Sequence, residues 1–128
     1  RLTATPEPTQ VPETPEFMAF KKAVEGLYEN VDIYRNDKGS YVEVLDSETE
    51  KKAYDNVISN NYDKTYLIIW EGILKFRYEQ AQNVSILATK SGLKDNILFA
   101  VSSPDKKVRY SIFVDGKLYQ EVFEDKER

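Results

Sequence analysis

Cysteine and histidine are both absent from the 128 residues of this chain. Their absence excludes thiolate nucleophiles, the Ser-His and Cys-His pairs that activate a nucleophile, zinc sites built on sulfur or imidazole, and haem or iron–sulfur ligation. We therefore expect no cofactor, and any catalysis would have to use carboxylates, lysine, serine or tyrosine. The lack of cysteine does not decide the redox compartment.

Long apolar runs and a strong charge of either sign are also missing. The longest apolar run covers only residues 66–70, whereas a helix that crosses a bilayer needs about 20 such residues. The 18 basic and 22 acidic side chains give a net charge of −4 and are spread along the whole chain. Such a chain lacks the basic surface that attracts phosphates, so we expect no nucleic-acid partner.

Proline is scarce except at the beginning of the chain. Four of the five prolines precede residue 16, and the segment 3–14 contains neither glycine nor an aromatic residue. Repeated X-Pro units favour the extended polyproline II conformation, so twelve such residues would span roughly 35 Å. We expect residues 1–14 to form a disordered but stiff Pro/Thr/Glu spacer and residues 15–128 to form a single globular domain.

In composition this spacer resembles the tether of mature surface lipoproteins of Gram-positive bacteria. The resemblance implies a lipidated cysteine upstream of Arg1, where the chain does not begin with Met. It also implies an extracellular or cell-surface location, with the membrane reached only through that upstream anchor. The alternative interpretation is a disordered tail or a linker within a longer protein.

The first part of the domain shows start signals for two helices with a hairpin between them. Thr14 followed by Pro15 is a helix start, and apolar residues then recur at helical spacing, which predicts a helix over residues 15–29. Residues 31–35 and 40–45 flank an Asn-Asp-Lys-Gly turn and predict a β-hairpin. The Ser-Glu-Thr-Glu stretch at 47–50 matches a capping box and predicts a second helix. The residues expected to face inward on these helices are Phe17, Phe20, Val24, Leu27, Ala53, Tyr54, Val57 and Ile58.

Residues 63–82 fit two structures. As a helix capped by Asp63, this segment places Trp70 and most of its other apolar residues on one side. As a hairpin, it turns at Glu71-Gly72, and apolar residues alternate with charged ones afterwards. The helix is favoured because its Gln-Ala-Gln ending suits a helix and Gly72 costs only about 1 kcal/mol there.

Beyond residue 83 the apolar residues recur with a period of two. This pattern predicts four consecutive strands, around residues 84–88, 97–101, 108–114 and 118–122, and Asp115-Gly116 is the strongest hairpin signal in the chain. Short connections between strands favour antiparallel pairing. The expected fold is therefore α+β, an antiparallel β-meander plus the N-terminal hairpin, with about three helices packed on one face.

The motifs that could carry chemistry are weak. Ser91 with Lys94, and Ser103 with Lys106, match S-x-x-K, but both lie in predicted turns, where a solvated lysine keeps its ordinary pKa and cannot act as a base. The oxygens around residues 36–43 lack the spacing of a calcium loop, so no metal ligands are expected. A carboxylate pair such as Asp32 and Glu43 could hydrolyse glycosides only within a substrate cleft.

Aromatic residues give the better indication of function. The predicted outer face of the sheet carries Tyr34 in the first hairpin and Tyr119 with Phe123 in the last strand, near Arg109 and Glu121. Tyrosine and arginine are the residue types that anchor protein contacts. We therefore expect a non-enzymatic, exported domain that binds a protein or a cell-envelope component. The alternatives are a small-ligand pocket protein of cystatin-like or NTF2-like shape and a carboxylate-dependent hydrolase.

Overall fold

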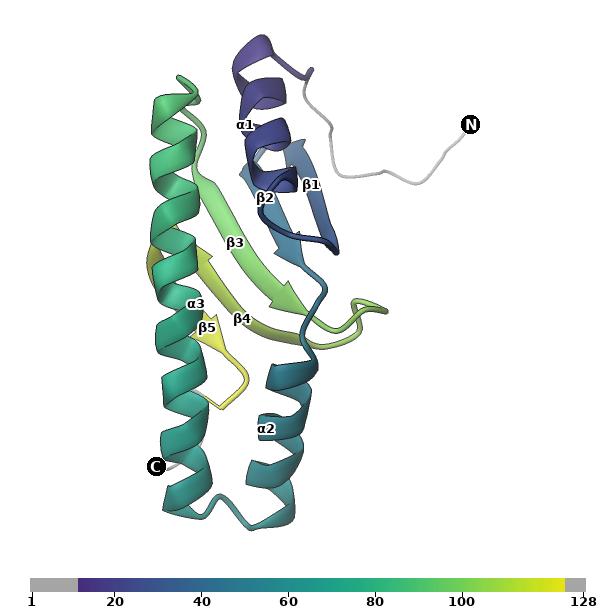
Figure 1. Ribbon diagram of the computed structural model, residues 1–128, viewed down its shortest axis with the longest axis vertical. Helices are drawn as coiled ribbons and strands as arrows, with labels where there is room; N and C mark the ends of the chain where they lie inside the picture. Colours follow the sequence, from purple (N-terminus) through teal and green to yellow (C-terminus); the bar gives the residue numbers. More distant parts are fainter. Residues whose placement is uncertain (1–11, 124–128) are drawn as a thin grey trace.

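The structure, a computed structural model, describes residues 12–123 (Figure 1). Helices and strands alternate in blocks, which confirms the predicted α+β class. Most of the predicted spacer, and residues 124–128, lie outside the described part of the chain. The elements in chain order are α1 (Pro15–Glu25), β1 (Val31–Asn36), β2 (Gly39–Val44), α2 (Glu48–Ser59), α3 (Lys64–Lys90), β3 (Ile97–Ser102), β4 (Arg109–Val114) and β5 (Lys117–Glu121).

The five strands form one sheet in the order β1-β2-β3-β4-β5. All neighbours are antiparallel except β2 and β3, which run parallel. Parallel neighbours need a long crossover, and here the chain leaves β2, passes through α2 and α3, and returns beside β2 as β3 (Figure 1). The predicted hairpin and the last three strands of the predicted meander are thus present, and the central parallel pair joins them.

Two helices begin where the sequence indicates. The Thr14 hydroxyl accepts the Phe17 N–H at 3.1 Å, with Pro15 as the first helical residue. The Asp63 carboxylate accepts the Thr65 N–H at 2.9 Å at the start of α3, which confirms a helix and not a hairpin from residue 64. The first helix is shorter than predicted, since α1 ends at Glu25 and not at residue 29. Leu27 therefore lies beyond the helix, where it is 58% exposed instead of facing inward.

Helix α3 continues through residues 84–88, so the strand predicted there is wrong. Ala81, Val84 and Ala88 are three and four residues apart, so they are buried together on one face of the helix. Val84 and Ala88 also fit the alternating apolar pattern of a strand, which explains the wrong prediction. The true end of the helix is a Schellman motif at Gly92, which has φ +80°. There the Leu93 N–H donates to the Ala88 carbonyl at 3.0 Å. The C-terminal meander consequently has three strands.

The helices lie on one side of the sheet (Figure 1). Helix α3 packs directly on it, α1 packs on α3 and shares an apolar cluster with the strands, and α2 packs on α3 beyond the lower end of the strands. Two apolar clusters share α3. The first fills the space between α1, α3 and the sheet, and includes Phe17, Phe20, Val24, Val42, Val84, Phe99 and Phe113. The second joins α2, α3 and the lower end of the sheet, and contains Ala53, Val57, Leu67, Trp70, Leu74, Tyr110 and Phe123.

A buried ion pair fixes α2 against α3. The Arg77 Nε and Nη2 atoms donate to the Glu50 carboxylate at 2.6 and 2.9 Å, and both side chains are almost fully buried. A buried charge needs a partner of opposite charge, and this demand overrides the capping box predicted for Ser47 and Glu50. Ser47 still precedes the first turn of α2, but its side chain makes no capping hydrogen bond.

Candidate functional site

Within residues 12–123, one face of the sheet has no helix packed against it. Ile33, Val42, Phe99 and Phe113 point toward the helices, and because successive side chains of a strand point to opposite faces, their neighbours in sequence point away from them. This second surface is called the open face below. Its residues, matched across the strands by the observed register, are Asp32, Tyr34, Tyr41, Glu43, Leu98, Ala100, Ser102, Arg109, Ile112, Val114 and Gln120.

Apolar and aromatic side chains run across the open face. Tyr34 of β1 pairs with Tyr41 of β2, and the two rings stack with centroids 4.8 Å apart and planes 7° from parallel. The next partners in the same row are Leu98 and Val114. All four side chains are half-buried. The row therefore offers apolar surface that is already ordered by its own neighbours.

Four charged side chains lie beside this row, around Glu43. The Glu43 side chain is only 4% exposed, and its carboxylate accepts the Ser102 hydroxyl at 2.6 Å. Arg109 Nη2 lies 3.5 Å and Lys106 Nζ lies 3.7 Å from the same carboxylate, and Lys106 also pairs with Asp32. Two acids and two bases balance, so the open face presents no net charge from this group.

The charged group also affects the Tyr34 phenol. Partial burial, and then the negative charge of Glu43, raise the pKa of Tyr34 above its ordinary value. The phenol therefore remains protonated at neutral pH and can donate a hydrogen bond. Under these conditions it cannot act as a general base.

A β-bulge in β4 places Arg109 on the open face. The register of β3 with β4 shifts between Val101 and Ser102, so that Ser111 lies opposite Val101 and Arg109 opposite Ser102. Tyr110 is the extra residue, and it is buried in the cluster under α2. Bulges commonly redirect side chains in this way. Below Arg109 the open face is hollowed by about 310 Å³ next to Ile112 and Gln120.

The structure brings together only part of the predicted binding set. Tyr34 and Arg109 lie on the open face and interact electrostatically. Tyr119 is 70% exposed, as expected, but it belongs to β5, and β1 and β5 are the two opposite edges of the sheet. The five residues therefore do not form one surface.

Phe123 and Glu121 are buried, so their predicted place on an outer face is wrong. Phe123 is 1% exposed and packs edge-on against Trp70, with ring centroids 5.2 Å apart. Glu121 is 7% exposed, and its carboxylate accepts the Trp70 indole N–H at 3.1 Å and the Phe123 N–H at 2.9 Å. A second register shift, in the β4–β5 pair, leaves Tyr119 unpaired and reverses the alternation after it.

Sequence reasoning missed Tyr41, Lys106 and Leu98. Tyr41 could have been found, because the predicted hairpin places it directly opposite Tyr34. The S-x-x-K motif relates Lys106 only to Ser103. In the structure the Ser103 hydroxyl donates to Asp105 at 2.7 Å, while Lys106 pairs with Asp32. No sequence signal located Leu98, since its place depends on the parallel β2–β3 pairing.

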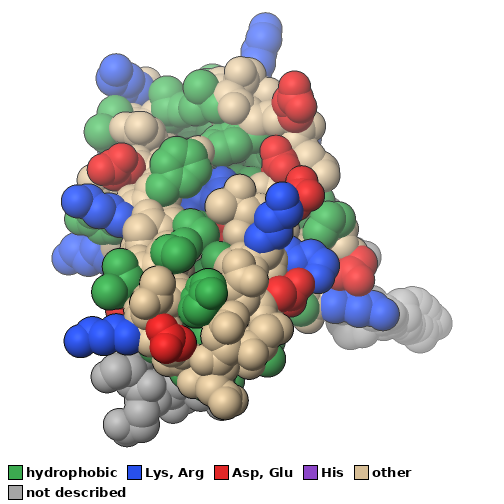
Figure 2. All heavy atoms as spheres, turned by 60° about the horizontal axis from the view of Figure 1, so that its bottom comes forward, with side chains coloured by type: hydrophobic (Ala, Val, Ile, Leu, Met, Phe, Trp, Pro, Cys, Tyr) green, Lys and Arg blue, Asp and Glu red, His purple; other side chains and the backbone are tan. Residues whose placement is uncertain are grey.

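A second apolar surface lies on the outer side of α3. Ile68, Ile69 and Phe76 are 60, 51 and 54% exposed, around Gly72. Figure 2 turns the lower end of the molecule forward and shows hydrophobic side chains reaching the surface between charged ones. The charged pair beneath this surface, Arg77 with Glu50, is already satisfied. The open face is the better candidate because it also offers hydrogen-bonding groups.

Comparison with protein-family models, curated proteins and solved structures finds no match for this chain. Within residues 12–123, no helix has the length and apolar character that a membrane crossing requires.

Proposed function

We propose that this chain is a non-enzymatic binding domain of an exported bacterial surface protein, and that it binds a protein partner through the open face. The observation that carries the proposal is the combination on that face of the stacked Tyr34–Tyr41 pair with Arg109. Tyrosine and arginine are enriched among the residues that dominate interface energies. The stack and the ion pairs also reduce the side-chain freedom that binding would otherwise remove.

The alternatives receive less support. A ligand pocket between helices and sheet, as in a cystatin-like or NTF2-like protein, would need free space where the rings of Phe17, Phe20, Phe99 and Phe113 are 0–1% exposed. A carboxylate-dependent hydrolase would need an acid and a base facing a cleft. Asp32 and Glu43 instead both contact Lys106, which favours a role in holding the surface together.

The proposed location depends on the composition of residues 1–14. A proline-rich, glycine-free segment suits a spacer that holds a small domain away from a membrane or cell wall. Protease added to intact cells of the native host should remove the domain, whereas protection until the cells are lysed would contradict export. This experiment tests the location independently of the binding surface.

A site-specific photo-crosslinker tests the binding surface. Benzoylphenylalanine at Tyr41 in the intact protein should yield an adduct with one protein of defined mass. The matched control is the same group at Met18, which is 56% exposed on α1. Arg109→Ala should weaken the Tyr41 adduct, and the variant should remain folded because Lys106 still lies 3.7 Å from the buried Glu43 carboxylate. An adduct from Met18 alone, or none from Tyr41, would contradict the proposal.

A further inference from the structure

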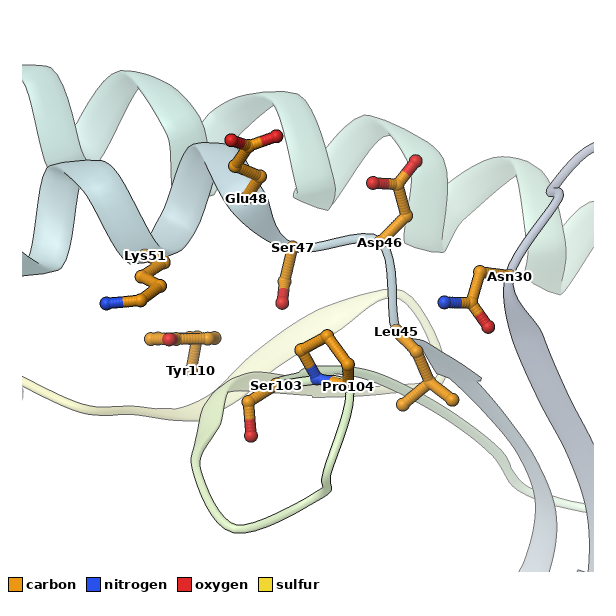
Figure 3. A pocket seen from close by; sticks show the side chains of 9 residues that line it. All are labelled: Asn30, Leu45, Asp46, Ser47, Glu48, Lys51, Ser103, Pro104 and Tyr110. Atoms are coloured by element: carbon orange, nitrogen blue, oxygen red, sulfur yellow. The ribbon is translucent and has the colours of Figure 1, made fainter.

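A pocket of about 370 Å³ lies at the start of α2, away from the open face. Its walls come from four separate parts of the chain (Figure 3). Asn30 precedes β1, Leu45 and Ser47 lie in the connection between β2 and α2, Pro104 lies in the β3–β4 turn, and Tyr110 belongs to β4. The size is within the range of sites that bind small molecules or single side chains.

The Ser47 hydroxyl is the unusual group in this pocket. Ser47 is only 3% exposed and occupies the N-cap position of α2, yet its side chain makes no capping hydrogen bond. No other hydrogen bond of this hydroxyl occurs within residues 12–123, and Figure 3 shows its oxygen pointing into the space above Pro104 and Tyr110. By contrast, the neighbouring Ser103 hydroxyl has partners, since it donates to Asp105 and accepts the Val108 N–H.

The start of α2 therefore offers unused hydrogen-bond donors. The first N–H groups of a helix have no partner within the helix, and the Ser47 side chain does not cap them here. The Glu50 carboxylate, which could have reached back in a capping box, is held by Arg77 instead. Together with the Ser47 O–H, these donors require an acceptor.

The charges around the pocket select the kind of acceptor. Asp46 and Glu48 flank Ser47, and Figure 3 shows their carboxylates pointing away from the pocket. The cation among the lining residues, Lys51, is already paired with Asp55 at 2.9 Å. Two carboxylates close to the donors disfavour an anion despite the helix dipole. A neutral carbonyl oxygen satisfies the donors without this repulsion.

The walls of the pocket determine which group can be attached to this carbonyl. Leu45, the Pro104 ring and the Tyr110 ring provide apolar surface beside the Ser47 hydroxyl. We propose that this pocket binds a short uncharged peptide segment, with a peptide carbonyl at Ser47 and the start of α2, and an apolar side chain against Leu45 and Pro104. This site is separate from the open face, and the argument for it does not depend on the proposed function.

The test is an NMR titration of the ¹⁵N-labelled protein with N-acetyl-L-leucinamide. Saturable shifts of the Ser47, Lys51 and Tyr110 amide signals are expected, with roughly millimolar affinity for so small a probe. Ser47→Ala should weaken binding about fivefold to tenfold, the effect of one lost hydrogen bond. Because the hydroxyl does not cap α2, this variant should melt at the same temperature. Pro104→Ala, a change in an exposed wall, should also weaken binding.

Two further probes and a control variant make the result decisive. The anion 4-methylpentanoate should bind more weakly than the amide; equal or tighter binding would show a helix-terminus anion site and overturn the proposal. N-acetylglucosamine should not bind, and Ser47-dependent binding of this sugar without binding of the leucine amide would also overturn it. Ser91→Ala, distant from the pocket, should leave the affinity unchanged. Unchanged affinity in Ser47→Ala would exclude the assigned contact.

Discussion

The buried Arg77–Glu50 pair should make Arg77→Met one of the most destabilising substitutions in the domain. Glu50 is 1% exposed, and two of its hydrogen-bond donors come from the Arg77 guanidinium, which also donates to the Asp46 carbonyl at 3.1 Å. Removing one partner of a buried pair leaves an uncompensated charge and costs about 3–5 kcal/mol. At about 4 °C per kcal/mol for a domain of this size, the melting temperature should fall by about 12–20 °C.

A double variant separates the charge effect from the loss of packing. Arg77→Met combined with Glu50→Leu replaces both charges by apolar side chains of similar size, and such replacements are often neutral or stabilising. We therefore expect the double variant to be more stable than Arg77→Met alone. Urea-induced unfolding followed by Trp70 fluorescence measures both, because Trp70 is fully buried and lies on the same helix.

The matched control is the exposed pair of Lys51 and Asp55 on α2. Its N···O distance of 2.9 Å is close to that of the buried pair, but the two side chains are 65 and 55% exposed. Lys51→Met should change the free energy of unfolding by less than about 1 kcal/mol. The reasoning is refuted if Arg77→Met costs no more than this control, or if the double variant is less stable than the single one.

The remaining predictions concern the pH dependence of stability and the contrast in burial between Phe123 and Tyr119 at the end of the sheet. The pKa of Asp95 in the folded protein is lowered by its hydrogen bonds from Arg35 and then from Ser40. The stability that Asp95 contributes is therefore fully present above its pKa in the unfolded chain, and it is lost as the pH falls through its pKa in the folded protein. The advantage of wild type over Asp95→Asn, about 1–2 kcal/mol at neutral pH, should shrink below about pH 4; a difference constant down to pH 2 in denaturant titrations would contradict this. Phe123→Ala should lower the free energy of unfolding by about 3–5 kcal/mol, and Tyr119→Ala should lower it by less than about 0.5 kcal/mol. Equal urea midpoints for these two variants would mean that Phe123 is not part of the core.

Local signals in the sequence predicted local structure well. Thr14 and Asp63 each accept an N–H in the first turn of their helices, and Asp115 and Gly116 adopt the positive φ values, 52° and 83°, of the predicted tight turn. Each of these features depends on residues only two or three positions apart. Such features can therefore be recognised from a short stretch of sequence.

Patterns that two structures share could not be resolved from the sequence. The alternation at 84–88 also fits a helix face, and the choice was made by continuation of α3 to its Schellman motif at Gly92. The two bulges likewise leave no mark in the sequence. They depend on the match of two strands, yet they decide that Arg109 is exposed and Phe123 is buried.

The sequence by itself determined the α+β class, most helix starts, the tight hairpin and the set of chemistries that a chain without cysteine and histidine can perform. Only the tertiary structure decided that β2 and β3 run side by side, which places Tyr41 next to Leu98 and builds the open face. It also decided that Glu50 pairs with Arg77, which leaves the Ser47 hydroxyl facing a pocket. The physical reason is the same in both cases: contacts between residues far apart in the chain depend on how whole elements pack, and no short stretch of sequence encodes them.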